Sequence, residues 1–96
     1  MGQAIQVEIT VAGDAAIFDT DRSITGQDGT SYTSAEQAAS DDRFPGRLAS
    51  ALFAQGDVAS VWVASNAVVV RRPAGWDDTA RDHAAQVIRD FFLHYE

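Results

Sequence analysis

The feature that most constrains this chain is a pair of short β-rich runs separated only by Ser65-Asn66. Residues 58–64 and 67–72 are rich in valine, and Ser-Asn is an adequate two-residue hairpin turn. Because successive side chains of a strand point to opposite faces, pairing across this turn gives the hairpin two distinct faces. One face, expected to meet the core, carries Val61, Val63, Val68 and Val70. The other carries Ser60, Trp62, Ala64, Val69 and Arg71.

The N-terminal part predicts a second hairpin. Apolar residues occupy every second position of residues 5–11, which is typical of a half-buried strand: Ile5, Val7, Ile9 and Val11. Gly13-Asp14 then forms a turn, and residues 15–19 form a short return strand. The polar stretch 20–31 contains two glycines and is expected to be a loop.

Two helices are predicted in the middle of the chain. Thr33 and Glu36 have the spacing of a capping box, so a short helix should run over residues 34–40 with Thr33 as its cap. Pro45 suits the first turn of a second helix, whose apolar stripe ends at Gly56.

A third helix is predicted to begin after Asp77 or Asp78 and to reach Tyr95. Its apolar residues recur at spacings of three and four: Ala80, Ala84, Val87, Ile88, Phe91 and Tyr95. The predicted order is therefore β-β-α-α-β-β-α. It indicates an α+β, two-layer fold, in which an antiparallel sheet of about four strands carries helices on one face. We expect residues 1–96 to form a single domain.

Composition excludes several classes of function. Fourteen acidic residues face seven arginines and no lysine, giving a net charge of −7. This charge disfavours binding to nucleic acid or to an anionic membrane. The absence of cysteine excludes disulfides and thiolate metal ligands. A basic region followed by an apolar run is missing at the start, so we expect no signal peptide and a cytoplasmic protein. Arginine without lysine fits a GC-rich bacterial genome, while the aspartate excess also fits a salt-adapted source.

No residue constellation predicts catalysis or a metal centre. His83 and His94 lie about 16 Å apart along one helix and cannot share an ion. The segment 19–30 lacks the Gly and Glu of a calcium loop, and Gly26-Gln27-Asp28-Gly29 lacks the lysine of a phosphate loop. Helix capping explains the carboxylates at the start of the third helix, Asp77, Asp78 and Asp82. We expect no catalytic, cofactor-binding or metal-ligating residue.

Residues 48–63 (LASALFAQGDVASVWV) resemble the signature of the Nfu/NifU amino-terminal domain family, in which an LA-x-x-LF helix leads into GV-x-SV and a hydrophobic hairpin. Residues 31–39, 68–70, 76–77 and 87–92 are also similar to that family. The family's Thr-Pro-Asn-Pro stretch is replaced here by residues 11–16, so its role is not carried over. Full-length Nfu proteins hold their cluster on a Cys-x-x-Cys pair in a separate domain, and this chain has no cysteine. The resemblance implies kinship to iron–sulfur cluster assembly without thiolate ligation.

These observations predict a non-enzymatic protein-interaction module, linked by the resemblance to iron–sulfur cluster assembly or delivery. We expect its partner to be another protein, such as an assembly or client protein, and the chain itself to be a monomer or weak homodimer. The predicted binding surface comprises Trp62, Val69, Arg71 and Ser60, because exposed apolar patches with Trp and Arg often mark partner sites. Trp62 could instead form a homodimer contact, or be buried under the loop at residues 20–31. The alternative function is a carboxylate-based binder of iron or another metal.

Overall fold

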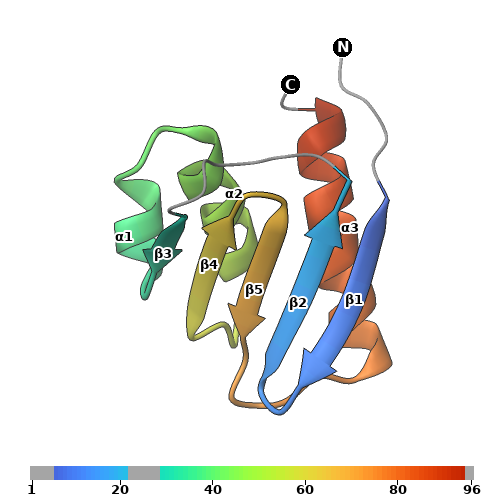
Figure 1. The fold of residues 1–96 in the computed structure, drawn as a ribbon. Coiled ribbons are helices and arrows are strands. Elements are labelled where there is room, and N and C mark those ends of the chain that lie inside the picture. The colour runs from blue at the N-terminus through green and yellow to red at the C-terminus, as the bar shows by residue number, and fades with distance from the viewer. Residues whose placement is uncertain (1–5, 22–28, 95–96) are drawn as a thin grey trace.

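The computed structural model describes residues 6–21 and 29–94, and in this part of the chain the predicted α+β fold is confirmed (Figure 1). The strands are β1 (Val7–Ala12), β2 (Ala15–Thr20), β3 (Thr30–Tyr32), β4 (Ser60–Ala64) and β5 (Ala67–Arg71). The helices are α1 (Ala35–Ala39), α2 (Phe44–Phe53) and α3 (Asp78–His94). The described residues thus contain one strand more than the sequence predicts.

The strands form one antiparallel sheet in the order β1-β2-β5-β4-β3. Helices α2 and α3 lie behind the sheet in Figure 1, and α1 lies beside β3 at one edge. The opposite face of the sheet carries no helix in the described part of the chain, and we call it the open face. The molecule therefore has two layers, as predicted, with its apolar core between the sheet and the helices.

The β4–β5 hairpin has the predicted register: Val61 pairs with Val70, Trp62 with Val69, and Val63 with Val68. The four valines that alternation assigns to the core are fully buried. They pack with large apolar side chains of the neighbouring elements, chiefly Phe18, Leu48, Leu52 and Ile88. Burial of one such side chain stabilises the fold by roughly 1.5–3 kcal/mol. At the turn, Ser65 has a φ of 55°, a conformation that few residues other than glycine adopt readily.

The central pairing of β2 with β5 joins segments about fifty residues apart in the sequence, and contacts at both ends fix it. At one end, Asn66 Nδ2 donates to the Thr20 carbonyl oxygen (2.8 Å), and the Thr20 amide donates to the Asn66 carbonyl oxygen (2.9 Å). At the other end, the Asp14 carbonyl oxygen accepts from the Arg72 amide (2.8 Å) and from Trp76 Nε1 (2.9 Å). These bonds hold β2 beside β5 in one register.

The structure corrects two predictions around residue 30. The predicted loop 20–31 is wrong at its end, because Thr30–Tyr32 pairs with β4 as a fifth strand; residues 22–28 lie outside the described part. The cap of α1 is Ser34 and not Thr33: Ser34 Oγ accepts from the Gln37 amide at 3.1 Å. Gln37 reaches back instead of Glu36, and its Oε1 accepts from the Thr33 amide at 2.8 Å. The cap is therefore displaced by one residue, and Gln37 bonds the amide that precedes the cap, whereas a capping box would bond the amide of the cap itself.

The other predicted elements lie close to their predicted bounds. Val7 and Ile9 of β1 are half-buried as alternation predicts, whereas Val11 is 38% exposed because β1 is an edge strand. Helix α2 has Pro45 in its first turn, and Phe44 packs edge-on against Phe91 of α3, with ring centroids 4.9 Å apart. Asp77 caps α3, since its Oδ1 accepts from the Ala80 amide at 2.7 Å. Ile5 and Tyr95 lie outside the described residues.

Candidate protein-binding face

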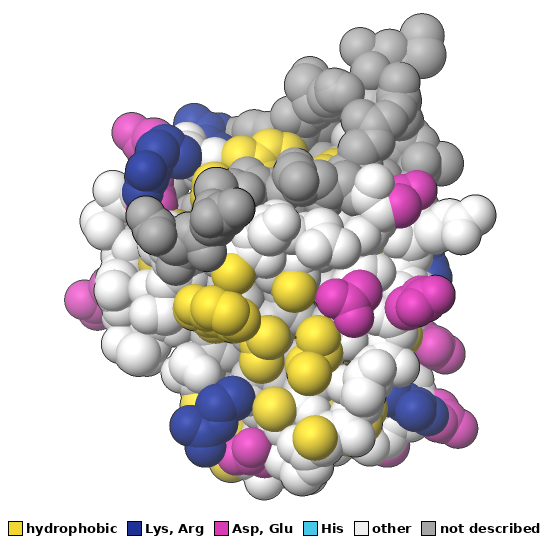
Figure 2. All heavy atoms as spheres, viewed as in Figure 1, with side chains coloured by type: hydrophobic (Ala, Val, Ile, Leu, Met, Phe, Trp, Pro, Cys, Tyr) yellow, Lys and Arg dark blue, Asp and Glu magenta, His cyan; other side chains and the backbone are white. Residues whose placement is uncertain are grey.

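A row of apolar side chains crosses the middle of the open face. The registers of the three central strands place Trp62, Val69 and Ile17 side by side. The row ends in small polar side chains on the edge strands, Ser31 on β3 and Thr10 on β1. Figure 2 shows hydrophobic side chains gathered over the centre of this face. Alanines 15, 64 and 67 lie on the same face in the adjacent rows and extend the apolar surface. We call the set Trp62, Val69, Ile17, Ala15, Ala64 and Ala67 the apolar patch.

Trp62 is the most exposed large residue of this patch. Its side chain is 44% exposed, while its strand neighbours Val61 and Val63 are fully buried on the core side. Val69 and Ile17 are half-buried beside it. The described residues therefore leave Trp62 open to solvent, and residues 22–28 of the alternative covering loop lie outside the described part of the chain. An exposed tryptophan within an apolar patch is a common feature of binding surfaces.

One end of the open face carries an ion pair. Arg71 lies opposite both Ser60 and Ala15, and its Nη2 donates to Asp14 Oδ2 at 2.9 Å. This hydrogen bond lowers the pKa of the Asp14 carboxyl and raises that of Arg71. Both side chains are well exposed, so the pair adds little to stability. The pair neutralises Arg71, which is the one basic residue that the sequence predicts on this face.

A different corner of the open face is acidic. Glu8 on β1 and Asp19 on β2 lie directly opposite each other, one row beyond Thr10 and Ile17. No ion pair of the described residues involves either carboxylate. Acidic side chains accordingly flank the hydrophobic area on one side in Figure 2. Like charges directly opposite across an antiparallel pair are destabilising, so this acidic pair is a locally unfavourable feature.

The structure places the four predicted site residues together. Ser60, Trp62, Val69 and Arg71 all project from the open face of the β4–β5 hairpin. Sequence reasoning missed Ile17, Glu8 and Asp19, because it did not predict that β2 pairs with β5. Alternation within residues 15–20 does place Ile17 and Asp19 on the face opposite Phe18. The missing information was the pairing of the two hairpins.

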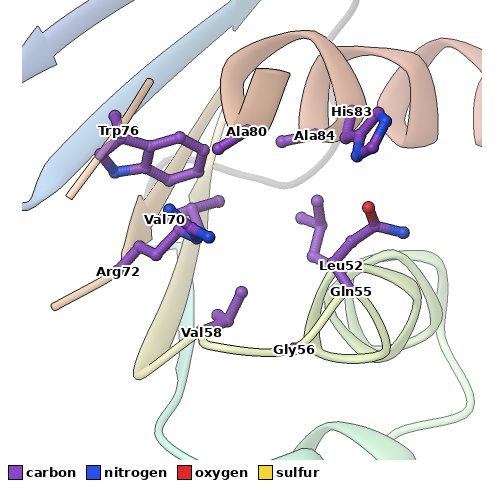
Figure 3. Close-up of a pocket in the computed structure, with 10 residues that line it drawn as sticks. All are labelled: Leu52, Gln55, Gly56, Val58, Val70, Arg72, Trp76, Ala80, His83 and Ala84. Atoms are coloured by element: carbon purple, nitrogen blue, oxygen red, sulfur yellow. The ribbon is translucent and has the colours of Figure 1, made fainter. Parts of the chain in front are cut away.

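A small hollow lies between α2, α3 and the end of β5 (Figure 3). Apolar side chains, including Leu52, Val70 and Ala84, line it, and Arg72 and His83 stand at opposite sides. Its volume of about 60 Å³ is less than half of the roughly 150 Å³ that holds a benzene ring. Arg72 is also engaged already: it donates to the Gly75 carbonyl oxygen at 2.5 Å and lies 3.6 Å from Asp57. This hollow suits a few water molecules better than an organic substrate.

A polar cluster beside β3 has a structural role. The Tyr32 hydroxyl donates to Asp41 Oδ2 at 2.5 Å, and Arg43 Nε donates to Asp41 Oδ1 at 2.9 Å. Burial and the carboxylate raise the pKa of Tyr32 to about 12, and the hydrogen bonds from Arg43 and Tyr32 hold the pKa of Asp41 well below its usual range. Since Tyr32 is 2% exposed, this cluster ties the α1–α2 connection to β3.

The acidic start of α3 does not assemble a metal site. Asp77 is occupied as the helix cap, and Asp78 forms an ion pair with Arg81. Within residues 6–21 and 29–94, no group of three or more His, Asp or Glu side chains is placed to hold a metal ion. His83 is exposed on α3, while the side chain of His94 lies outside the described atoms.

Comparison with known proteins adds no assignment. No protein-family model and no curated protein matches the sequence. The resemblance of residues 48–63 to the Nfu/NifU amino-terminal domain therefore stays a prediction. Among the described residues, no helix has both the length and the apolar character needed to cross a bilayer.

Proposed function

We propose that this chain is a non-enzymatic protein-binding module that docks through the open face of its sheet. The observation that carries the proposal is the exposure of Trp62 in a continuous apolar row with Val69 and Ile17. Tryptophan contributes heavily to binding where it meets a partner. Here the helices already fill the core side of the sheet, so Trp62 has no role in closing the core.

The proposed partner is a protein that acts in iron–sulfur cluster assembly or uses the product of that assembly. The support for this part is the resemblance of residues 48–63 to the Nfu/NifU amino-terminal domain. Those residues form the C-terminal part of α2, the connection to β4 and most of β4 itself, which displays Trp62. A chain without cysteine cannot hold a cluster by thiolates. Its contribution would be recognition, with the cluster ligands supplied by the partner or by another domain.

Affinity purification with quantitative mass spectrometry tests the proposal. The tagged protein is compared with Trp62→Ala and with the control Val11→Ala, which truncates the other exposed large apolar side chain of the described residues. We expect a set of proteins that the original chain and Val11→Ala retain equally and that Trp62→Ala loses at least tenfold. Circular dichroism must show that both variants stay folded. An identical set of bound proteins for all three forms would refute docking through Trp62.

The identity of the retained proteins tests the second part separately. Proteins that depend on Trp62 should include cluster-assembly factors or proteins that require a cluster. If Trp62-dependent partners are found and none of them handles iron or sulfur, the binding role stands and the link to cluster assembly falls.

A further inference from the structure

We infer that the open face takes a partner segment that pairs an apolar side chain with a basic one, and that the acidic pair Glu8–Asp19 receives the basic group. This inference rests on the proposed function and adds the chemistry of the partner. It concerns the whole face: the apolar patch supplies the contact area, and the acidic pair supplies orientation.

The charge pattern of the face supports a basic partner. Glu8 and Asp19 lie directly opposite each other without a cation in any ion pair of the described residues. Arg71 does not balance them, because it is held by Asp14 at the end of the strands distant from Glu8 and Asp19. A lysine or arginine of a partner would relieve the repulsion between the two carboxylates, and complementary charge of this kind guides the orientation of docking.

The sheet geometry gives the spacing between the two groups on the partner. Asp19 lies two strands and two residues away from Trp62, and Glu8 lies three strands and two residues away. With strands about 4.8 Å apart and a rise of about 3.3 Å per residue, these separations are about 12 Å and 16 Å. An extended segment covers the shorter distance, about 12 Å to Asp19, in about four residues, and a helix covers the same distance in about eight. The partner should therefore carry its basic residue four positions from an apolar residue if extended, or seven to eight positions away if helical.

A second copy of this chain fits the face less well. Each copy carries a net charge of −7, and Arg71 on the open face is already paired, whereas no ion pair among residues 6–21 and 29–94 involves Glu8 or Asp19. Face-to-face dimerisation would bring two acidic surfaces together, which costs association free energy. A basic and apolar segment of another protein has the complementary character.

Selection from a random 12-residue peptide library displayed on phage tests the inference, with the original protein as bait and Trp62→Ala for counter-selection. Recovered peptides should carry Lys or Arg at the stated spacing from Leu, Ile, Phe or Trp. Their synthetic forms are then titrated against Glu8→Gln/Asp19→Asn and against Asp82→Asn, a control on the exposed surface of α3. We expect the double variant to bind at least tenfold more weakly at low salt and to lose most of the salt dependence. Asp82→Asn should change affinity less than twofold.

A measurement of stability shows whether Glu8 and Asp19 serve docking or the fold itself. The double variant removes a like-charge contact, so its urea midpoint should equal or exceed that of the original protein. Trp62-dependent peptides that lack basic residues, or that bind the double variant normally, would overturn this inference and leave the proposed function intact. Recovery of no Trp62-dependent peptide would overturn both. A Trp62-dependent dimer in sedimentation equilibrium would assign the face to a second copy and overturn the inference as well.

Discussion

Replacement of Gly46 by alanine should destabilise this protein, although the same change inside most helices is favourable. Gly46 lies in the first turns of α2 and is buried. A Cβ built there lies 2.2 Å from the Asp41 carbonyl oxygen and 2.4 Å from Asp41 Cβ. Contacts below 3.0 Å essentially never occur for a real Cβ, so the backbone at Asp41 must move away. Overpacking of this kind costs about 1–3 kcal/mol, against a gain of roughly 1 kcal/mol in helix propensity.

Because the closest atom belongs to the backbone, the overpacking cost should lie in the upper half of that range, so the expected net loss for Gly46→Ala is about 1–2 kcal/mol, or roughly 5–15 °C in melting temperature for a domain of this size. Urea unfolding followed by far-ultraviolet circular dichroism measures it. Ser50→Ala in the same helix is the control and should leave stability unchanged or slightly higher. The variant should also disturb the Asp41–Tyr32 hydrogen bond, so the pKa of Tyr32 should fall from about 12 toward its ordinary value near 10. A Gly46→Ala protein as stable as the original would refute the argument.

Three further outcomes follow from described contacts. Because the pKa of Tyr32 is raised to about 12, the free energy of unfolding should hold up to about pH 10 and fall from there to pH 12. Tyr32→Phe should remove most of that slope in urea titrations at fixed pH. Asn66→Ala deletes the 2.8 Å bond to the Thr20 carbonyl oxygen and should cost about 1 kcal/mol, visible as a lower urea midpoint. Ser65→Gly relieves a φ of 55° and should increase the free energy of unfolding by up to about 1 kcal/mol, which raises the urea midpoint; a lower midpoint would contradict the turn geometry.

Much of the fold follows from local patterns in the sequence. The β4–β5 hairpin and its buried valines follow from alternation and a short turn, which are properties of neighbouring residues. The fifth strand could not be predicted in this way. Thr30–Tyr32 has only three residues and little hydrophobic alternation, and it becomes a strand because β4 offers an edge to pair with. The capping error at α1 has a similar cause, because Thr33 and Ser34 are both good caps and adjacent in sequence.

Only half of the candidate site could be predicted from the sequence. Trp62, Val69 and Arg71 belong to one hairpin, so their common face follows from the register of that hairpin. The contribution of β2 depends on the contacts that place it beside β5, such as the Thr20–Asn66 bonds across 46 residues. The acidic pair depends in addition on the register of β1 against β2. These are long-range facts that local periodicity does not contain.

Two features of the open face conflict with the requirements of folding. A sheet face that only needed to be solvated would carry small polar or mixed charged residues, as Ser31 and Thr10 do at its edges. Instead the open face exposes Trp62 beside Val69, and its corner sets Glu8 opposite Asp19. Natural sequences agree with their fold at most positions, and local disagreements are expected where function requires them. The two disagreements lie on the same face and within one row of each other, so the proposed docking would account for both, whereas the helix-covered face of the sheet shows neither.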